Sequence, residues 1–167
     1  MLFADTFDPM ELLFASQTLN LEPSPRRLNA RLEALLCNGI GATKAELAIW
    51  VDQKIDWVLQ STQEPADAPT DIGAAAQRVP LSALHHAASM AEPLLLGDAL
   101  ADGRFAHDPY FQGMTCCSLM IVPVLRYRAA RALLILENRE RAGAFTACRF
   151  DAVMVISDQL AIALEDV

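Results

Sequence analysis

Basic residues are scarce in this chain. Its 167 residues include 13 Lys and Arg against 21 Asp and Glu, which gives a formal net charge of -8. A surface of that sign repels a phosphate backbone, so we expect no nucleic-acid partner. The one short basic cluster comprises Arg126, Arg128 and Arg131. We interpret this cluster as a solvated turn between two strands, with an anion-binding site as the alternative.

Long apolar runs are lacking as well. The longest runs, such as residues 119–125, have the length of a core strand, so we expect neither a membrane span nor a membrane partner. Residues 1–14 contain Asp5, Asp8 and Glu11 but no Lys or Arg, which is unlike a signal peptide. These two observations predict a cytoplasmic protein.

Motifs of metal sites and of common enzymes are also missing. The sequence contains no HExxH, no Walker loop and no GxSxG. The four cysteines show no CxxC or His/Cys spacing: Cys37, Cys116, Cys117 and Cys148. Cys116 and Cys117 would point to opposite faces of a strand, and His85 and His86 to different faces of a helix. We therefore predict reduced thiols, no metal site and no catalytic residue.

Thiol chemistry is the one enzymatic route that the sequence leaves open. Cys116 lies at the entry to a strand, where solvent access is plausible, and Cys148 lies at a helix N-terminus, where the dipole favours a thiolate. Neither has an obvious resolving partner. Buried, inert thiols are the simpler interpretation.

What the chain has in quantity is apolar residues, at 53%. The length and this composition fit a single compact domain with a substantial core. Periodicity and breakers predict helices over residues 8–19, 24–37, 80–90 and 147–165, and strands over residues 46–51, 56–60, 93–96, 118–125 and 131–137. Residues 61–73 are expected to form an exposed loop. Asp98 and residues around it lie in an irregular stretch, 97–114.

This order of elements predicts a mainly antiparallel sheet with helices on one face. The long connections must then cover the other face, which leaves a cleft under residues 97–114. We divide the chain into an N-terminal helix and connector, residues 1–27, and a domain over residues 28–167.

The last predicted helix carries two apolar stripes. One stripe faces the core, and the second suggests contact with another helix: Ala152, Val155, Ile156, Gln159, Ile162 and Ala163. A homodimer formed through the terminal helices is one interpretation. A helix covered within its own domain by the first two helices is the other.

Several segments, in this order, resemble those of the GAF domain family over about residues 28–165. They are Pro93-Leu94-Leu95-Leu96-Gly97-Asp98, Ser118-Leu119-Met120-Ile121-Val122-Pro123-Val124, Leu133-Leu134-Ile135-Leu136-Glu137-Asn138 and Gly143-Ala144-Phe145-Thr146. The chain is most similar to GAF domains of bacterial sensor kinases and regulators. The resemblance implies an α+β fold with a six-stranded antiparallel sheet, helices on one face and a ligand pocket on the other.

The sequence also departs from the family in three places. Cys117 stands where many relatives have an arginine before the central-strand serine, and the Asn-Lys-Phe-Asp-Glu signature of cyclic-nucleotide binders is missing. Ser118 stands where bilin-binding relatives continue a Cys-His pair. We therefore expect neither a cyclic nucleotide nor a bilin, and His107 is more plausibly exposed than a haem ligand.

The expected ligand-binding residues come from the irregular stretch and the strands beside it: Asp98, Phe105, His107, Asp108, Tyr110, Phe111, Cys116, Ser118 and Glu137. Polar groups converging on an apolar cleft are typical of small-molecule sites. The competing interpretation makes Asp98 a turn cap, and Tyr110 and Phe111 anchors packed on the core.

The sequence thus favours a non-catalytic sensory domain that binds an unidentified small molecule and signals through its terminal helices. The first alternative is a dimerisation or scaffold module with a vestigial pocket. The second is a thiol-based redox sensor or an enzyme similar to the free methionine-R-sulfoxide reductases, which share the GAF fold.

Overall fold

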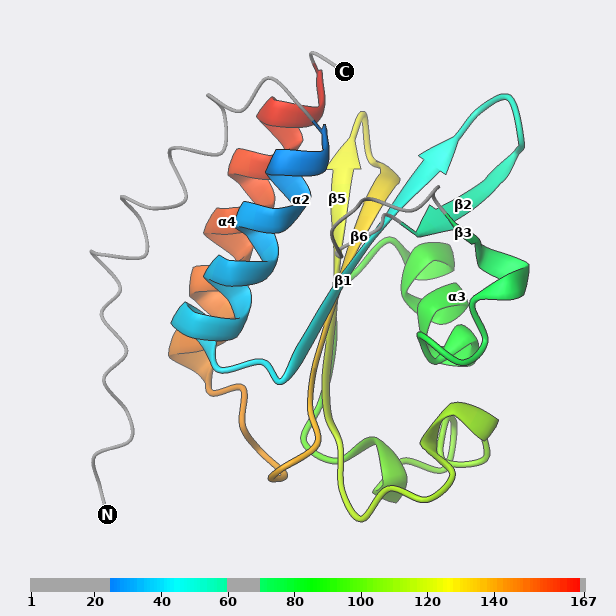
Figure 1. Ribbon diagram of the computed structural model, residues 1–167, viewed down its shortest axis with the longest axis vertical. Coiled ribbons are helices and arrows are strands. Elements are labelled where there is room, and N and C mark those ends of the chain that lie inside the picture. Colours follow the sequence, from blue (N-terminus) through cyan, green and yellow to red (C-terminus); the bar gives the residue numbers. More distant parts are fainter. Residues whose placement is uncertain (1–24, 60–69, 166–167) are drawn as a thin grey trace.

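The computed structural model describes residues 25–59 and 70–165. They form three layers, with α2 and α4 on one face of a central sheet and α3 on the other (Figure 1). We name the face under α2 and α4 the back and the face under α3 the front. The predicted helix over residues 8–19 lies outside the described residues.

The sheet has six strands in the order β3-β2-β1-β6-β5-β4, and every pairing is antiparallel. The strands are β1 (Lys44–Val51), β2 (Asp56–Leu59), β3 (Thr70–Asp71), β4 (Leu94–Leu96), β5 (Ser118–Arg126) and β6 (Ala129–Asn138). Because β3 has only two residues, five strands form the body of the sheet. The predicted α+β class, antiparallel sheet and one-sided pair of helices are confirmed.

The helices are α2 (Pro25–Ala34), α3 (Leu81–Met90) and α4 (Ala147–Glu165), with short turns η2 (Leu35–Ile40), η3 (Ile72–Ala74), η4 (Ala99–Ala101) and η5 (Pro109–Phe111). No helix among the described residues is long and apolar enough to cross a membrane. Thr146 caps α4 as predicted, since its Oγ1 accepts from the amide of Arg149 at 3.3 Å.

Two local predictions are wrong. The segment predicted to end at Asn38-Gly39 continues as a π-helical turn to Ile40, and Gly41 ends it with a left-handed φ of 87°. The left-handed φ favours glycine at this position, and an added Cβ would also lie 3.0 Å from the Arg149 guanidinium, which would have to shift. The second error concerns the end of the predicted loop 61–73, because residues 70–74 form β3 and η3, while residues 61–69 lie outside the described residues.

The core is divided by the sheet, as the alternation of strand side chains requires. Back-facing residues such as Leu47, Val122 and Leu134 pack with Val153 and Leu160 of α4. The front cluster joins strand residues to α3 and to the irregular stretch, and includes Leu119, Leu133, Leu84, Phe105 and Phe111. The irregular stretch therefore lies over the front face, as predicted.

Candidate ligand-binding site

Three charged side chains surround the phenol of Tyr110 on the front face. Tyr110 donates its hydroxyl hydrogen to Glu137 Oε2 at 2.6 Å and accepts from Lys44 Nζ at 3.2 Å and from Arg139 Nη2 at 2.9 Å. Arg139 Nε also donates to Glu137 Oε1 at 2.6 Å. We name Lys44, Tyr110, Glu137 and Arg139 the Tyr110 cluster.

Strand register explains why the cluster forms at this place. Lys44 is paired with Glu137 across β1 and β6, so their side chains stand beside each other on one face. Tyr110 reaches them from η5, whose first turn is capped by Asp108. Arg139 follows β6 directly. The Lys44 ammonium and the Arg139 guanidinium also lie 5.3 Å and 5.5 Å from the centre of the Tyr110 ring.

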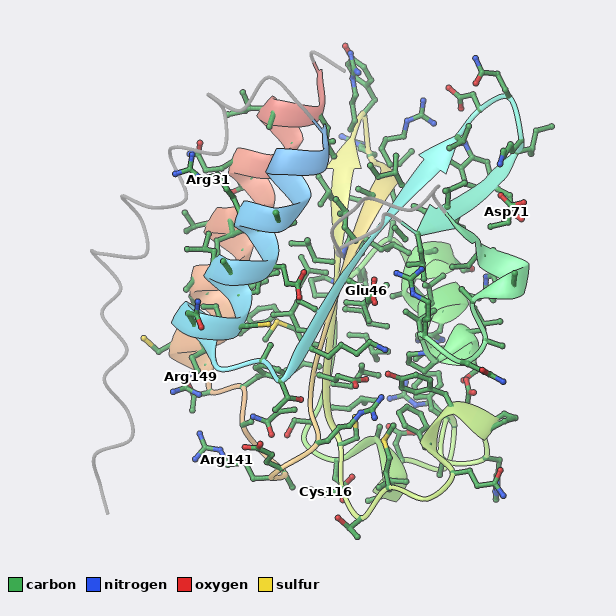
Figure 2. All side chains as sticks on the ribbon, viewed as in Figure 1. Arg31, Glu46, Asp71, Cys116, Arg141 and Arg149 are labelled. Carbon is green, nitrogen blue, oxygen red and sulfur yellow. The ribbon has the colours of Figure 1, made fainter. Side chains whose placement is uncertain are left out.

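A second ion pair adjoins the cluster. Glu46 is two residues along β1 and therefore on the same face, where its Oε2 lies 2.9 Å from Arg78 Nη2. Lys44 Nζ donates to the carbonyl oxygen of Arg78, which joins the pair to the cluster. Figure 2 shows Glu46 in the space between the sheet and α3. The front of β1 is thus charged where its back is apolar.

Burial sets the electrostatics of these groups. Desolvation raises the pKa of the Tyr110 phenol, and the neighbouring Glu137 charge raises it further. Desolvation likewise lowers the pKa of Lys44 and raises that of Glu46. Each shift favours the neutral form, as expected for groups removed from water. Hydrogen bonds and neighbouring opposite charges offset the free-energy cost of burying these polar groups.

Three of the predicted site residues hold backbone instead of facing a cleft. Asp98 Oδ1 accepts from the amides of Leu100 and Cys117, each at 3.1 Å, so it is the turn cap that the competing interpretation described. Asp108 caps η5 and also accepts from Ser82 at the start of α3. Ser118 is the third of these residues.

The buried Ser118 hydroxyl joins three segments. It lies 3.2 Å and 2.7 Å from the carbonyl oxygens of Gly97 and Arg141, and it accepts from the amide of Ala144 at 3.0 Å. These contacts bind the ends of β4 and β5 to the connection that leads into α4. Ser118 is therefore a structural residue.

The remaining predicted residues separate into core and surface. Phe105 and Phe111 are buried in the front cluster, so they are core anchors. His107 is exposed, as expected. Cys116 is half-buried at the lower end of the sheet, with its Sγ 3.4 Å from the Arg139 carbonyl oxygen (Figure 2). Tyr110 and Glu137 are the two predicted residues whose side chains are hydrogen-bonded to each other.

Sequence reasoning missed Lys44, Glu46, Arg78 and Arg139. A signal was present for the first two, because alternate charged residues at the start of an otherwise apolar strand must share one face. Arg139 stands two residues after Glu137, with the same implication. Arg78 lies in a connection, and no pattern in the sequence indicated that it would pair with β1.

The predicted second stripe of α4 is only partly accessible. Ile156 is fully buried in the back core, so its prediction as an interface residue is wrong. Ala152, Gln159 and Ala163 are half-buried, whereas Val155 and Ile162 are 38% and 51% exposed. The six residues therefore do not share one exposed face, because α4 packs against the back of the sheet with Ile156 on the side that contacts the core.

Two of the four thiols are disfavoured as thiolates by burial. Burial raises the pKa of Cys117 to about 12, which opposes thiolate formation. Burial also raises the pKa of Cys37. Within residues 25–59 and 70–165, no three His, Cys, Asp or Glu residues are grouped as a metal site requires.

Comparison with known proteins agrees with the architecture. A sequence model of the GAF domain matches residues 26–164. The hybrid signal transduction histidine kinase G of Dictyostelium discoideum is 28% identical over 86 residues, which are 52% of this chain. The chain spans about 2% of the length of that kinase.

Solved structures show the same fold at low identity. The GAF domain of an Acinetobacter phosphoenolpyruvate-protein phosphotransferase superposes with a TM-score of 0.70 at 15% identity, covering 93% of this chain and 92% of that one. The free methionine-R-sulfoxide reductase of Neisseria meningitidis, in complex with its substrate, gives a TM-score of 0.63 at 15% identity. That match covers 100% of this chain and 99% of the reductase.

Proposed function

Because this chain belongs to the GAF domain family, we propose that it is a non-catalytic sensory domain. It binds a small polar molecule on the front face of the sheet and signals through α2 and α4. The observation that carries this proposal is the Tyr110 cluster. It combines the buried Glu137, the half-buried Lys44 and the exposed Arg139 around the buried Tyr110 phenol, at the border of the apolar front core.

The cluster supports ligand binding because apolar residues of similar size could fill the same place in a stable fold. Replacing buried ion pairs by apolar residues of similar volume is often neutral or stabilising, so their presence asks for another reason. Ionisable groups whose pKa values are shifted by burial, as those of Lys44 and Tyr110 are, are typical of functional sites when they lie beside an apolar wall. Tyr110 closes the cluster from a short turn, so a ligand would replace the hydrogen bonds that its hydroxyl makes.

The donors and acceptors favour a zwitterion of amino-acid size. Glu137 offers a carboxylate to an ammonium group, while Lys44 and Arg139 offer charged donors to a carboxylate. The reductase with the same fold is named for a free amino acid derivative. That name supports the ligand class proposed for this chain but carries no catalytic role to it.

Thermal unfolding in the presence of a panel of free amino acids, methionine sulfoxide included, tests the proposal. A binder at 100 times its Kd should stabilise the protein by about 2.7 kcal/mol, which raises Tm by roughly 5–10 °C. Glu137→Gln should abolish the rise, and Tyr127→Phe, on an exposed turn, should preserve it. A panel that leaves Tm unchanged for the wild-type protein would count against an amino-acid ligand.

Dimerisation is a second function that one observation favours. Val155 and Ile162 expose large apolar side chains on α4, the helix we propose as output element. Sedimentation should then show a dimer at micromolar concentration that Val155→Glu with Ile162→Glu converts to monomer. A wild-type monomer at that concentration would remove this function. A chain with the double substitution that stays dimeric would place the interface elsewhere.

The thiol alternative finds less support. The raised pKa of Cys117 disfavours it as a nucleophile, and Cys116 directs its Sγ to a backbone carbonyl. Alkylation of the native protein at neutral pH measures this directly. Rapid modification of Cys116 alone would reopen the redox interpretation.

A further inference from the structure

A hollow lies at the other end of β5 and β6 from the Tyr110 cluster. It has a volume of about 490 Å³, within the range of ligand and peptide sites. Its walls come from the ends of β1, β5, β6 and α4, and they include Trp50, Leu125, Arg126, Tyr127, Arg131 and Leu164. We name this hollow the hairpin groove.

The turn beside the groove has an unfavourable backbone. Arg126 pairs with Ala129, so Tyr127 and Arg128 form a two-residue hairpin loop, and their φ angles are 53° and 68°. Such loops favour Asn-Gly, because larger residues are strained at positive φ. In this turn the Tyr127 side chain is 91% exposed and lines the groove. Retained strain of this kind is a reason to look for a function.

The residue types at the groove are those of a protein-binding surface. Trp, Tyr and Arg dominate the energetic centres of interfaces. The Arg126 guanidinium lies 5.4 Å from the centre of the Tyr127 ring, and Leu125 is exposed next to it. An aromatic and aliphatic surface is thus bordered by cations.

The charge of the groove specifies its occupant further. Arg126 and Arg131 line the groove, and Arg128 lies in the adjoining turn. The one carboxylate among the lining residues is Asp52, to which Arg131 donates two hydrogen bonds at 3.2 Å and 3.1 Å. Trp50 Nε1 also donates to Asp52 at 3.0 Å. Asp52 is therefore already paired, and the excess positive charge belongs to Arg126 and Arg128. A partner should carry carboxylates and apolar side chains together.

We propose that the hairpin groove binds residues 3–22 of the same chain. That segment, which lies outside the described residues, contains four carboxylates and no basic residue: Asp5, Asp8, Glu11 and Glu22. It also contains eight Phe, Leu and Met residues, including Met10 and Phe14. Pro25 begins α2 at the end of the helix pair where α4 ends, and Leu164 of α4 lines the groove (Figure 1). The segment therefore joins the described fold at the end that holds the groove.

Site-specific photo-crosslinking in the full chain tests this assignment. p-Benzoylphenylalanine replaces Tyr127, and mass spectrometry maps the crosslinked peptides in a mixture of ¹⁵N-labelled and unlabelled protein. Crosslinks to residues 3–22 within one isotope label are the expected result. The matched control carries the photo-residue at Ile55, which is 76% exposed on the β1–β2 turn and is not a groove residue. It should give a much lower yield of that crosslink.

Charge reversal provides the second arm. Arg126→Glu with Arg128→Glu should lower the ratio of docked to undocked segment by about tenfold, since two attractions become repulsions. Asp5→Lys with Asp8→Lys in the same chain should restore the crosslink. Arg141→Glu, an exposed arginine at the other end of the sheet, should change nothing. Circular dichroism verifies that each variant is folded.

Three results would overturn the assignment: no crosslink to residues 3–22, crosslinks only between differently labelled copies, or a yield that the reversal leaves unchanged. Crosslinks only between labels would identify a second copy as the occupant. None of these outcomes bears on the amino-acid titration at the Tyr110 cluster, because the two sites share no residue.

Discussion

Removing a single oxygen atom from Tyr110 probes the cluster on which the proposed function depends. Tyr110→Phe keeps the ring, its edge contact with Phe111 and its place in the front core. It removes only the hydroxyl. Tyr127→Phe makes the same chemical change at the one other tyrosine of the chain, which is 91% exposed. Comparing the two variants therefore shows how much of the effect depends on the buried position of the Tyr110 hydroxyl.

The size of the effect follows from what the hydroxyl satisfies. Glu137, which is buried, loses a 2.6 Å hydrogen bond at Oε2. Leaving a buried charged acceptor short of one partner costs about 1–3 kcal/mol. We expect a loss of about 2 kcal/mol for Tyr110→Phe, which lowers Tm by roughly 4–8 °C in a domain of this size. Tyr127→Phe should change stability by less than about 0.5 kcal/mol.

Urea unfolding followed by tryptophan fluorescence gives both free energies, because the two tryptophans report on the sheet. The midpoint should shift for Tyr110→Phe without a change of slope. Equal midpoints for the two variants would refute the reasoning, because the hydroxyl would then contribute nothing to Glu137. An increase in stability would refute it too, and would indicate that water or a rearranged Arg139 replaces the phenol.

Three further predictions concern the surrounding structure. Because the pKa of Cys117 is raised to about 12, the unfolded chain loses the thiol proton at lower pH than the folded chain. The stability from this group is complete below the ordinary thiol pKa of about 8.5, and it falls as pH rises by up to about 1.4 kcal/mol per pH unit. Urea titrations from pH 8 to 11 should therefore show that the free energy of unfolding falls less steeply with pH for Cys117→Ala than for the wild-type protein. Ser118→Ala should cost about 1–3 kcal/mol in the same assay, since the Ala144 amide loses its acceptor. Asp108→Ala removes the cap of η5 and its link to Ser82, so limited proteolysis should cut the 97–114 stretch faster than in the wild-type protein.

Much of the fold could be predicted because its signals are local. Residues 118–125 and 131–137 are almost continuously apolar, and each forms a strand buried on both faces. Thr146 precedes an apolar repeat and caps α4. The helix end at Gly41 was missed, although the glycine there has the left-handed φ of a helix C-cap, and the Arg149 guanidinium lies close to it in the fold. No short-range pattern contains that contact.

The site was predictable only in part, since its members come from four segments. Glu137 and Tyr110 were expected as ligand residues, and the structure places them in contact. That Lys44 would stand beside Glu137 depends on the register between β1 and β6, which two residues so far apart in the chain do not reveal. Ile156 was assigned to the wrong side of α4, because an alanine-rich helix has no sharp apolar edge.

The connection from β6 to α4 gives the Tyr110 cluster a physical link to both back helices. Arg139 belongs to the cluster, and the preceding Asn138 donates its Nδ2 to the carbonyl of Gly41, which ends the α2 segment, at 2.9 Å. Further along, the Arg149 guanidinium in the first turn of α4 donates to the carbonyl of Ala144 at 3.1 Å. A ligand that moves Arg139 would therefore pull on a connection that contacts the start of α4 and the end of α2. Proximity alone does not show coupling, since a ligand signals only if it binds one helix arrangement better than another. Asn138→Ala separates the two requirements: ligand affinity should survive this change on the back of the sheet, whereas any ligand-induced change in the helices should weaken.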